Sequence, residues 1–322
     1  MPRVIDRVPR VSVVISTFNR ATLLPATLDS VLAQTMADFE LIVVDDGSTD
    51  ETARVVERYG TRVRYVFQEN RERGAARNHG LRLASGEFVA LLDSDDLWTP
   101  RKLEAEVDYA DRRPDVGLVY SSAAHIDEGG RVVRRVRTPA YEGDVLRHIV
   151  RRNFIPFGAN IVRRSLLLAC GGFNEDRRLA GSEDWELWTR LAAQTRFGRV
   201  ADVGLLYRQH AGASVTNVPS MRRSMRRAFF LMYANPDLVP RITRYREHTL
   251  AHIDLVAGSL SYAANRPAEA RRLLYRAAKR TWRVVPSRHF LGLALRLAAG
   301  RRLTRAGQRF LRPSMTRVAP GE

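Results

Sequence analysis

The sequence predicts an α/β fold in which a mostly parallel sheet is flanked by helices and followed by a C-terminal helical extension. Short β-branched and apolar runs alternate with amphipathic stretches over the first hundred residues, a pattern typical of right-handed βαβ units. From about residue 221 the spacing of apolar residues is helical. A chain of 322 residues accommodates one large and one smaller domain, which we predict at residues 1–220 and 221–322.

Each element of the first part follows from its own pattern. Strands are expected where four to six apolar residues run together, and helices where apolar residues recur every three or four positions. Thr22 is a good N-cap for the first helix, whose apolar residues at 24, 28, 31 and 32 fall on one face. The predicted strands are 11–16, 40–44, 63–68 and 87–92, and the predicted helices are 22–32, 51–59 and 75–84.

The later elements are less regular. The Gly129-Gly130 pair predicts a hairpin turn, and the Asn265-Arg266-Pro267 stretch predicts a break between two helices within 257–281. Strands are also expected at 117–121 and 200–207, and a helix at 183–193.

The positive charge is concentrated in the tail. The net charge is +18, and residues 221–322 hold 22 basic and 5 acidic side chains, so the first 220 residues are nearly neutral. A basic surface concentrates phosphate-bearing partners such as nucleic acid, anionic lipid or a lipid-diphosphate substrate. The basic tail has two interpretations, which we weight equally. It is either a segment that is attracted to an anionic membrane or a solvated helical bundle with arginine-rich faces.

The compartment is predicted to be cytoplasmic, with peripheral association at the inner face of the cell membrane as an open alternative. A single cysteine, Cys170, excludes an internal disulfide framework and suits a reducing compartment. The apolar run at residues 11–15 is too short for a secretory signal, and no run approaches the length of a membrane span.

Acidic side chains follow two of the predicted strands. One strand ends in Asp45-Asp46 and another in Asp93-Ser94-Asp95-Asp96. Ligands of open α/β sheets bind at the carboxyl ends of the strands, and clustered carboxylates repel one another unless a cation lies between them. Mg²⁺ or Mn²⁺ is the cation such oxygens prefer. Either cluster alone also fits ordinary turn and cap chemistry.

A third acidic motif opens the helix at 183–193. Ser182 is a candidate N-cap, and Glu183 and Asp184 lie in the first turn, beside the positive end of the helix dipole. Favourable helix-start chemistry alone explains this composition. Tryptophans at such positions are more often core residues than platforms for sugar rings, so we predict that Trp185 and Trp188 lie in the core.

These motifs together resemble the family 2 glycosyltransferases, which have the GT-A fold. The resemblance runs from about residue 11 to residue 214, and the ordered set of motifs is far more specific than any one of them. The matching segments are residues 11–20, 43–50, 74–78, 91–96, 171–173, 183–184 and 207–210.

The resemblance implies a donor site. Ser16 and Asp46 match the residues that contact the nucleotide base, and Arg77 is a weaker candidate for the nucleotide or diphosphate. Asp93, the first aspartate of the Asp-x-Asp motif, would face the ribose or donor sugar, and it is also a candidate metal ligand.

The resemblance also implies a metal site and a base. Asp95 matches the aspartate that binds the metal, with Asp96 as an alternative ligand. His210 matches a residue near the metal or diphosphate, and a surface histidine without a role is equally weighted. Asp184 matches the general base of the Glu-Asp motif.

The implied activity is metal-dependent, inverting transfer of a sugar from a nucleotide-sugar, with UDP the first candidate nucleotide, to a glycan or lipid-linked acceptor. The implied setting is bacterial surface polysaccharide, lipopolysaccharide or glycolipid assembly. Processive members carry a Gln-x-x-Arg-Trp motif, but Gln194 is followed by Thr195-Arg196-Phe197, so single addition is favoured.

Three other classes are alternatives. A nucleic-acid-binding protein would carry aromatic residues in a basic groove, which this sequence does not display, so we expect no nucleic-acid partner. A nucleotidyltransferase would carry a lysine in a phosphate-binding loop near the N-terminus, and residues 11–50 contain no lysine. A catalytically inactive, sugar-binding or scaffolding relative is disfavoured because Asp93, Asp95 and Asp184 are all present.

Overall fold

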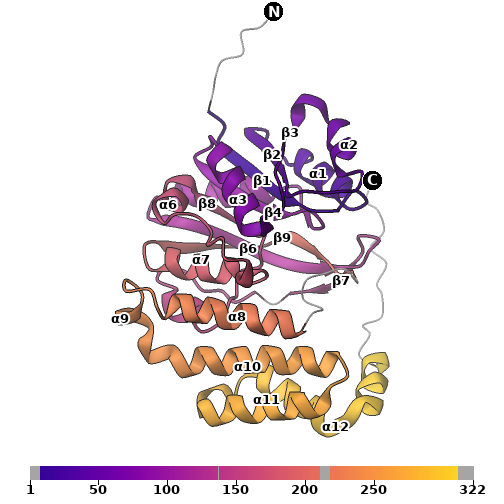
Figure 1. The fold of residues 1–322 in the computed structure, drawn as a ribbon, viewed down its shortest axis with the longest axis vertical. Helices are drawn as coiled ribbons and strands as arrows, with labels where there is room; N and C mark the ends of the chain where they lie inside the picture. The colour runs from indigo at the N-terminus through magenta and orange to yellow at the C-terminus, as the bar shows by residue number, and fades with distance from the viewer. Residues whose placement is uncertain (1–7, 137, 211–217, 311–322) are drawn as a thin grey trace, which may run out of the picture. The chain divides into compact units, whose positions relative to one another are not determined.

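The computed structural model describes residues 8–136, 138–210 and 218–310 (Figure 1). The chain divides into two compact units, residues 1–246 and 247–322. Helix α8 (Val218–Met232), which spans the predicted boundary at residue 220, belongs to the first unit and packs against α7 (Glu183–Ala192). The assignment of catalysis to residues 1–220 remains a prediction.

The first unit is built on one sheet. Its strand order in the described residues is β3-β2-β1-β4-β8-β6-β9-β5, with β7 added beside β6. The strands are β1 (Val11–Thr17), β2 (Phe39–Asp45), β3 (Arg64–Phe67), β4 (Phe88–Asp93), β5 (Leu97–Trp98), β6 (Val116–Ile126), β7 (Val132–Arg135), β8 (Asn160–Arg163) and β9 (Arg196–Arg208).

The sheet has a parallel half and a mixed half. Strands β1, β2, β3 and β4 pair in parallel, as the alternating pattern predicts. Beyond β4 the sheet continues through the antiparallel β8 and the long β6, which pairs in parallel with β9. The predicted α/β fold with helices on the sheet is therefore confirmed, and the Gly129-Gly130 turn does join the antiparallel pair β6 and β7.

Helices flank the sheet of the first unit (Figure 1). They are α1 (Leu24–Leu32), α2 (Thr52–Glu57), α3 (Glu72–Leu83), α4 (Lys102–Arg112), α5 (Leu146–Ile149), α6 (Arg164–Ala169), α7, α8 and α9 (Val239–Ile242). The predicted cap of α1 is wrong. The N-cap position is Leu23, and no side chain in the described part of the chain caps this helix. Pro25 fits within the first turn because its missing N–H would be unpaired there.

The apolar core packs the strands of the first unit closely against its helices. Alternate residues of β1, such as Val13 and Ile15, are fully buried in one apolar cluster with Leu24 and Leu28 of α1. Helix α3 lies close to β1 because Gly80 has no side chain: a Cβ there would meet Val14 Cγ1 at 2.2 Å. The strand ends beside these helices are thus held by close packing.

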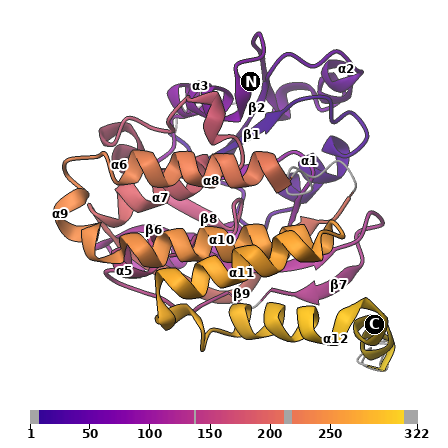
Figure 2. The same cartoon turned by 60° about the horizontal axis from the view of Figure 1, so that its bottom comes forward.

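The second unit is helical. It contains α10 (Arg246–Ala263), α11 (Pro267–Arg280) and α12 (Arg288–Phe310), and α10 and α11 lie side by side (Figure 2). The predicted break between two helices is confirmed, with Asn265 in the left-handed region at a φ of 65°. In the described part of the chain, no helix is long and apolar enough to cross a membrane.

Candidate active site

The ends of three parallel strands bring the first site residues together. In the register of β1 with its neighbours, Ser16 lies opposite Val44 of β2 on one side and Asp93 of β4 on the other. Asp46 follows directly after β2, and its backbone N–H donates to the Thr17 carbonyl oxygen at 2.9 Å. Ser16, Asp46 and Asp93 therefore share one edge of the sheet.

A cavity of about 270 Å³ opens over this edge. Six of the seven predicted site residues line it: Ser16, Asp46, Asp93, Asp95, Asp184 and His210. They come from segments up to 194 positions apart, so the tertiary fold assembles the predicted cluster. Arg77 is the exception and lies buried behind the cavity wall.

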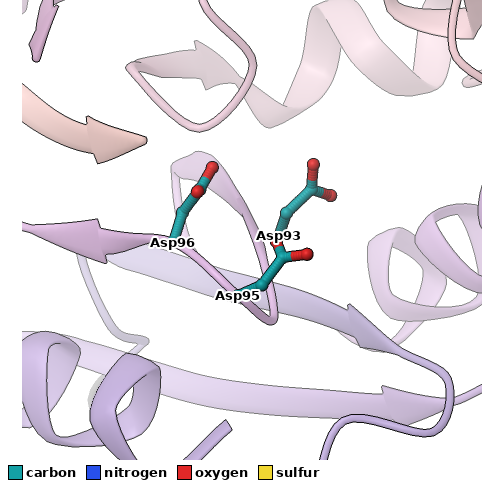
Figure 3. Close-up of side chains that lie close together, drawn as sticks. All are labelled: Asp93, Asp95 and Asp96. Atoms are coloured by element: carbon teal, nitrogen blue, oxygen red, sulfur yellow. The ribbon is translucent and has the colours of Figure 1, made fainter. Parts of the chain in front are cut away.

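The acidic cluster consists of Asp93, Asp95 and Asp96, on β4 and the loop that follows it (Figure 3). Each presents a carboxylate oxygen, and these atoms lie within 4.8 Å of one another. Burial, strengthened by repulsion between the carboxylates, raises the pKa of Asp93 and of Asp96. The backbone N–H of Arg208 donates to Asp96 Oδ1 at 2.8 Å, whereas the buried Oδ2 has no hydrogen-bond partner among the described residues.

These residues fit a divalent cation. The donor set is all carboxylate oxygen, the preference of Mg²⁺ and Mn²⁺, and the buried Asp96 Oδ2 is left without a hydrogen-bond partner among the described residues. The cluster therefore supports a divalent metal without distinguishing between the two ions.

Asp95 connects the acidic cluster to residues at and just after the end of β9. His210 Nε2 lies 3.0 Å from Asp95 Oδ2, and Arg20 Nε lies 3.5 Å from the same oxygen. The buried guanidinium of Arg208 donates to the Asp95 carbonyl oxygen at 3.0 Å, which holds the loop after β4 against the end of β9.

Asp184 enters the cavity from the first turn of α7. Asn153 Nδ2 donates to its Oδ2 at 2.9 Å, and the backbone N–H of Trp185 donates to its Oδ1 at 2.7 Å. Burial and the neighbouring Glu183 carboxylate raise the pKa of Asp184 to about 7. Ser182 occupies the N-cap position as predicted, but its side chain makes no capping bond.

Arg77 connects Glu183, the neighbour of Asp184 in the chain, to the acidic cluster. Its guanidinium, 2% exposed, donates to Glu183 Oε1 at 2.5 Å and to Asp93 Oδ1 at 2.8 Å. It also lies 3.7 Å from the centroid of the Phe157 ring. The contacts with Arg77 lower the pKa of Glu183 despite its burial. Arg77 thus orients two carboxylates, and Arg73, one turn earlier on α3, is the arginine of this helix that lines the cavity.

Asp46 also lines the cavity and is held by hydrogen bonds from the loop before α3. Its Oδ1 accepts from Gln68 Nε2 at 2.7 Å and from the backbone N–H of Arg71 at 2.9 Å. Asn70 Nδ2 donates to the Asp46 carbonyl oxygen at 2.9 Å. The loop before α3 therefore holds both the side-chain carboxylate and the backbone carbonyl of Asp46.

Sequence reasoning missed Arg73 and Asn153. Arg73 lies in the first turn of α3, which begins three residues before the predicted start at 75 and has no side-chain cap within the described chain to signal it. Asn153 lies in a loop with no motif, and only the fold places it beside Asp184. Trp185 and Trp188 are 2% and 0% exposed, which confirms that they are core residues and not ring platforms.

Comparison with known proteins gives the class. A mannosyltransferase from Pyrobaculum calidifontis, solved with GDP-Man and Mn²⁺, superimposes with a TM-score of 0.62 at 24% identity, over 94% of this chain and 84% of that one. TarS residues 1–349 from S. aureus, solved with UDP-GlcNAc, superimposes with a TM-score of 0.58 at 18% identity, over 84% and 89%. The fold is therefore the GT-A-like fold of glycosyltransferases.

Sequence comparison gives the family. The model for glycosyl transferase family 2 matches residues 12–171. An uncharacterized glycosyltransferase from Rickettsia bellii is 29% identical over 206 residues, which are 62% of this chain and 29% of that protein. The chain thus spans less than a third of the length of that relative. The chain belongs to glycosyl transferase family 2.

Proposed function

We propose that this chain is an inverting, single-addition glycosyltransferase that moves a sugar from a nucleotide-diphosphate sugar to an acceptor hydroxyl. The observation that carries the proposal is Asp184, a carboxyl group with a pKa of about 7 in the same cavity as the acidic cluster and Asp46. UDP is the first candidate nucleotide, and the UDP-GlcNAc of TarS and the GDP-Man of the mannosyltransferase support a donor of this class.

The donor residues are assigned by their place in the cavity. Ser16 and Asp46 are proposed to contact the nucleotide base, with Asp46 accepting a hydrogen bond from a ring N–H. Asp93 is proposed to face the ribose or donor sugar. Arg77 acts on the donor only through Asp93, because it donates to that carboxylate from behind the cavity wall.

Asp95, Asp93 and His210 are proposed to hold Mg²⁺ or Mn²⁺, with Asp96 as an additional ligand. When bound, the cation neutralises charge on the diphosphate leaving group. The Mn²⁺ bound by the mannosyltransferase supports this assignment. Arg73 and Arg20 add positive charge to the same cavity, where it also favours a diphosphate.

Asp184 is proposed to act as the general base. The acceptor hydroxyl oxygen attacks C1 of the donor sugar while its proton moves to the Asp184 carboxylate. The bond from C1 to the diphosphate oxygen breaks, and the electron pair leaves with the nucleotide diphosphate. One displacement of this kind inverts the anomeric centre. The Asn153 amide and the Trp185 N–H keep the carboxylate oriented during the transfer.

The setting belongs to the proposal. We propose assembly of bacterial surface polysaccharide, lipopolysaccharide or glycolipid, on a glycan or lipid-linked acceptor at the cytoplasmic side of the membrane. Peripheral attachment through the basic C-terminal region remains a prediction, and so does the expected lack of a nucleic-acid partner.

The D184N variant tests the proposed base. It keeps the size of the side chain but accepts no proton, so we expect kcat to fall by about 10²–10⁴-fold while the donor dissociation constant changes by less than about threefold. D144N is the matched control, because the Asp144 side chain is 72% exposed and does not line the cavity. Equal losses of donor affinity and turnover in D184N would contradict the assignment.

A further inference from the structure

Next to the active-site cavity lies a second hollow of about 350 Å³, which we call the arginine pocket. Its lining consists of Arg177, Arg178, Ala180, Ser220, Arg223, Arg226, Arg227 and Phe230. Among the described residues, five guanidinium groups thus surround a space large enough for a sugar phosphate or diphosphate, and no carboxylate is part of this lining.

The arginines of α8 share one face. Arg223, Arg226, Arg227 and Phe230 are spaced at three, four and seven positions, which places them above one another on a helix. Arg223 and Arg226 are exposed, and neither forms an ion pair within the described chain. Like charges at this spacing destabilise a helix, so such a face is costly unless an anion neutralises it.

Asp176 organises the other side of the pocket. Its Oδ2 accepts from Arg227 Nε at 2.6 Å, and both of its oxygens accept from Arg178. The Asp176 side chain is 16% exposed, and the Arg227 side chain is 24% exposed. One carboxylate therefore fixes two guanidinium groups before any ligand arrives and leaves the pocket with an excess of positive charge.

The arginine pocket adjoins the side of the active site that carries Asp184. Ala180 and Ser220 face the pocket, and their chain neighbours Gly181 and Met221 face the active-site cavity together with Asp184. A Cβ on Gly181 would lie 3.2 Å from Met221 Cε, so these two residues form a thin shared wall. Asp46, the proposed nucleotide contact, belongs to the other cavity alone.

We propose that the arginine pocket binds a phosphate or diphosphate group carried by the acceptor, and so positions the acceptor hydroxyl near Asp184. The guanidinium fork matches phosphate oxygens in pairs, and several such forks favour a ligand with more than one negative charge. This inference rests on the proposed function, because it names the acceptor of the same transfer. The phosphate belongs either to a lipid-linked acceptor or to a water-soluble phosphorylated glycan.

Binding of inorganic pyrophosphate to the full-length protein tests the pocket. Titrations are made by calorimetry in EDTA and 150 mM NaCl, since the metal-free acidic cluster repels anions and leaves the arginine pocket as the proposed site. We expect R223Q/R226Q to bind pyrophosphate at least tenfold more weakly than the natural sequence. R271Q/R272Q removes two exposed arginines of α11 and is expected to change affinity by less than twofold.

Two results would overturn the proposal. One is no measurable pyrophosphate binding by the natural sequence, and the other is an equal loss of affinity in R223Q/R226Q and in R271Q/R272Q. The thermal midpoint and far-UV circular dichroism of each variant establish that it is folded. Because all four arginines are exposed, we expect these values to match the natural sequence.

Geranyl diphosphate distinguishes the two sources of phosphate. Phe230 is 58% exposed at the rim, and the Arg227 guanidinium lies 5.2 Å from its ring centroid. Tighter binding of geranyl diphosphate than of pyrophosphate, with the gain lost in F230A, would support a lipid-linked acceptor. Equal affinities would support a water-soluble phosphorylated acceptor.

A measurement of donor binding distinguishes failure of the arginine-pocket proposal from failure of the proposed function. Thermal stabilisation by UDP-GlcNAc with Mn²⁺ reports the donor site, and R223Q/R226Q is expected to retain it. If donor stabilisation persists and pyrophosphate affinity does not depend on Arg223 and Arg226, the pocket proposal fails alone. If no nucleotide-sugar stabilises any of these proteins, the proposed function fails first.

Discussion

The position of Asp184 in the fold shifts its pKa toward the range expected of a general base. An aspartate in water has a pKa near 3.8, far below the pH at which a weak base works best. Burial at the start of α7 and the charge of Glu183 raise that pKa to about 7, while Asn153 and Trp185 orient the two oxygens. The side chain is thereby poised to accept a proton at neutral pH.

The raised pKa predicts a pH profile. Only the carboxylate form accepts a proton, so kcat/KM should rise about tenfold per pH unit below pH 7 and level off above it. The profile is measured between pH 5 and 9 at saturating Mn²⁺. In D184N, the residual kcat/KM should no longer fall below pH 7. An unchanged fall in this variant would mean that another group titrates there.

The seven candidate residues were predicted from short motifs, and six of them line one cavity. These motifs can be recognised in the sequence because they lie at the ends of strands and helices. Carboxylates do not pack in the core there, so their presence indicates a binding site. Arg77 differs, since a motif gives the identity of an arginine but not the direction of its side chain. The roles assigned to all seven remain predictions.

At the scale of elements, buried parallel strands were the easiest to predict. Strands β1, β2 and β4 each contain a run of at least three apolar residues, because both of their faces are covered. Strand β6 extends five residues beyond its predicted end at 121, since Ser121 and Ser122 interrupt the apolar run although both are buried. Strand β9 begins four residues early for a similar reason, as Arg196 and Arg199 lie within it.

Arg77 ties three elements together, which gives a prediction at this scale. It belongs to α3, and it pairs with Asp93 at the end of β4 and with Glu183 at the start of α7. R77M leaves two carboxylates without their buried partner, so we expect the free energy of unfolding to fall by about 3–5 kcal/mol.

The matched control for R77M lies on the same helix. Arg82 is exposed, and R82M should change the free energy of unfolding by no more than about 0.5 kcal/mol. Both values come from urea unfolding followed by circular dichroism. Similar small effects of R77M and R82M would mean that the carboxylates do not depend on Arg77.

At the scale of the whole molecule, the sequence predicted the class of fold but not the contacts between distant segments. The pairing of β6 with β9, the position of Asn153 beside Asp184 and the arginine pocket all depend on tertiary packing. No local pattern encodes such contacts. The basic second unit illustrates the same limit, since its charge was evident from the sequence and its partner remains a prediction.

The central claim is that carboxylates from distant segments bind one cation and one nucleotide-sugar. The most direct measurement is thermal unfolding with a panel of nucleotide-sugars, with Mn²⁺ or with EDTA, for the natural sequence and for D95N. At a donor concentration about 100 times the dissociation constant, stabilisation should reach about 2.7 kcal/mol with Mn²⁺ and largely vanish with EDTA or in D95N. Stabilisation that is absent for every donor, or that remains as large in EDTA and in D95N as in the natural sequence with Mn²⁺, would contradict the account.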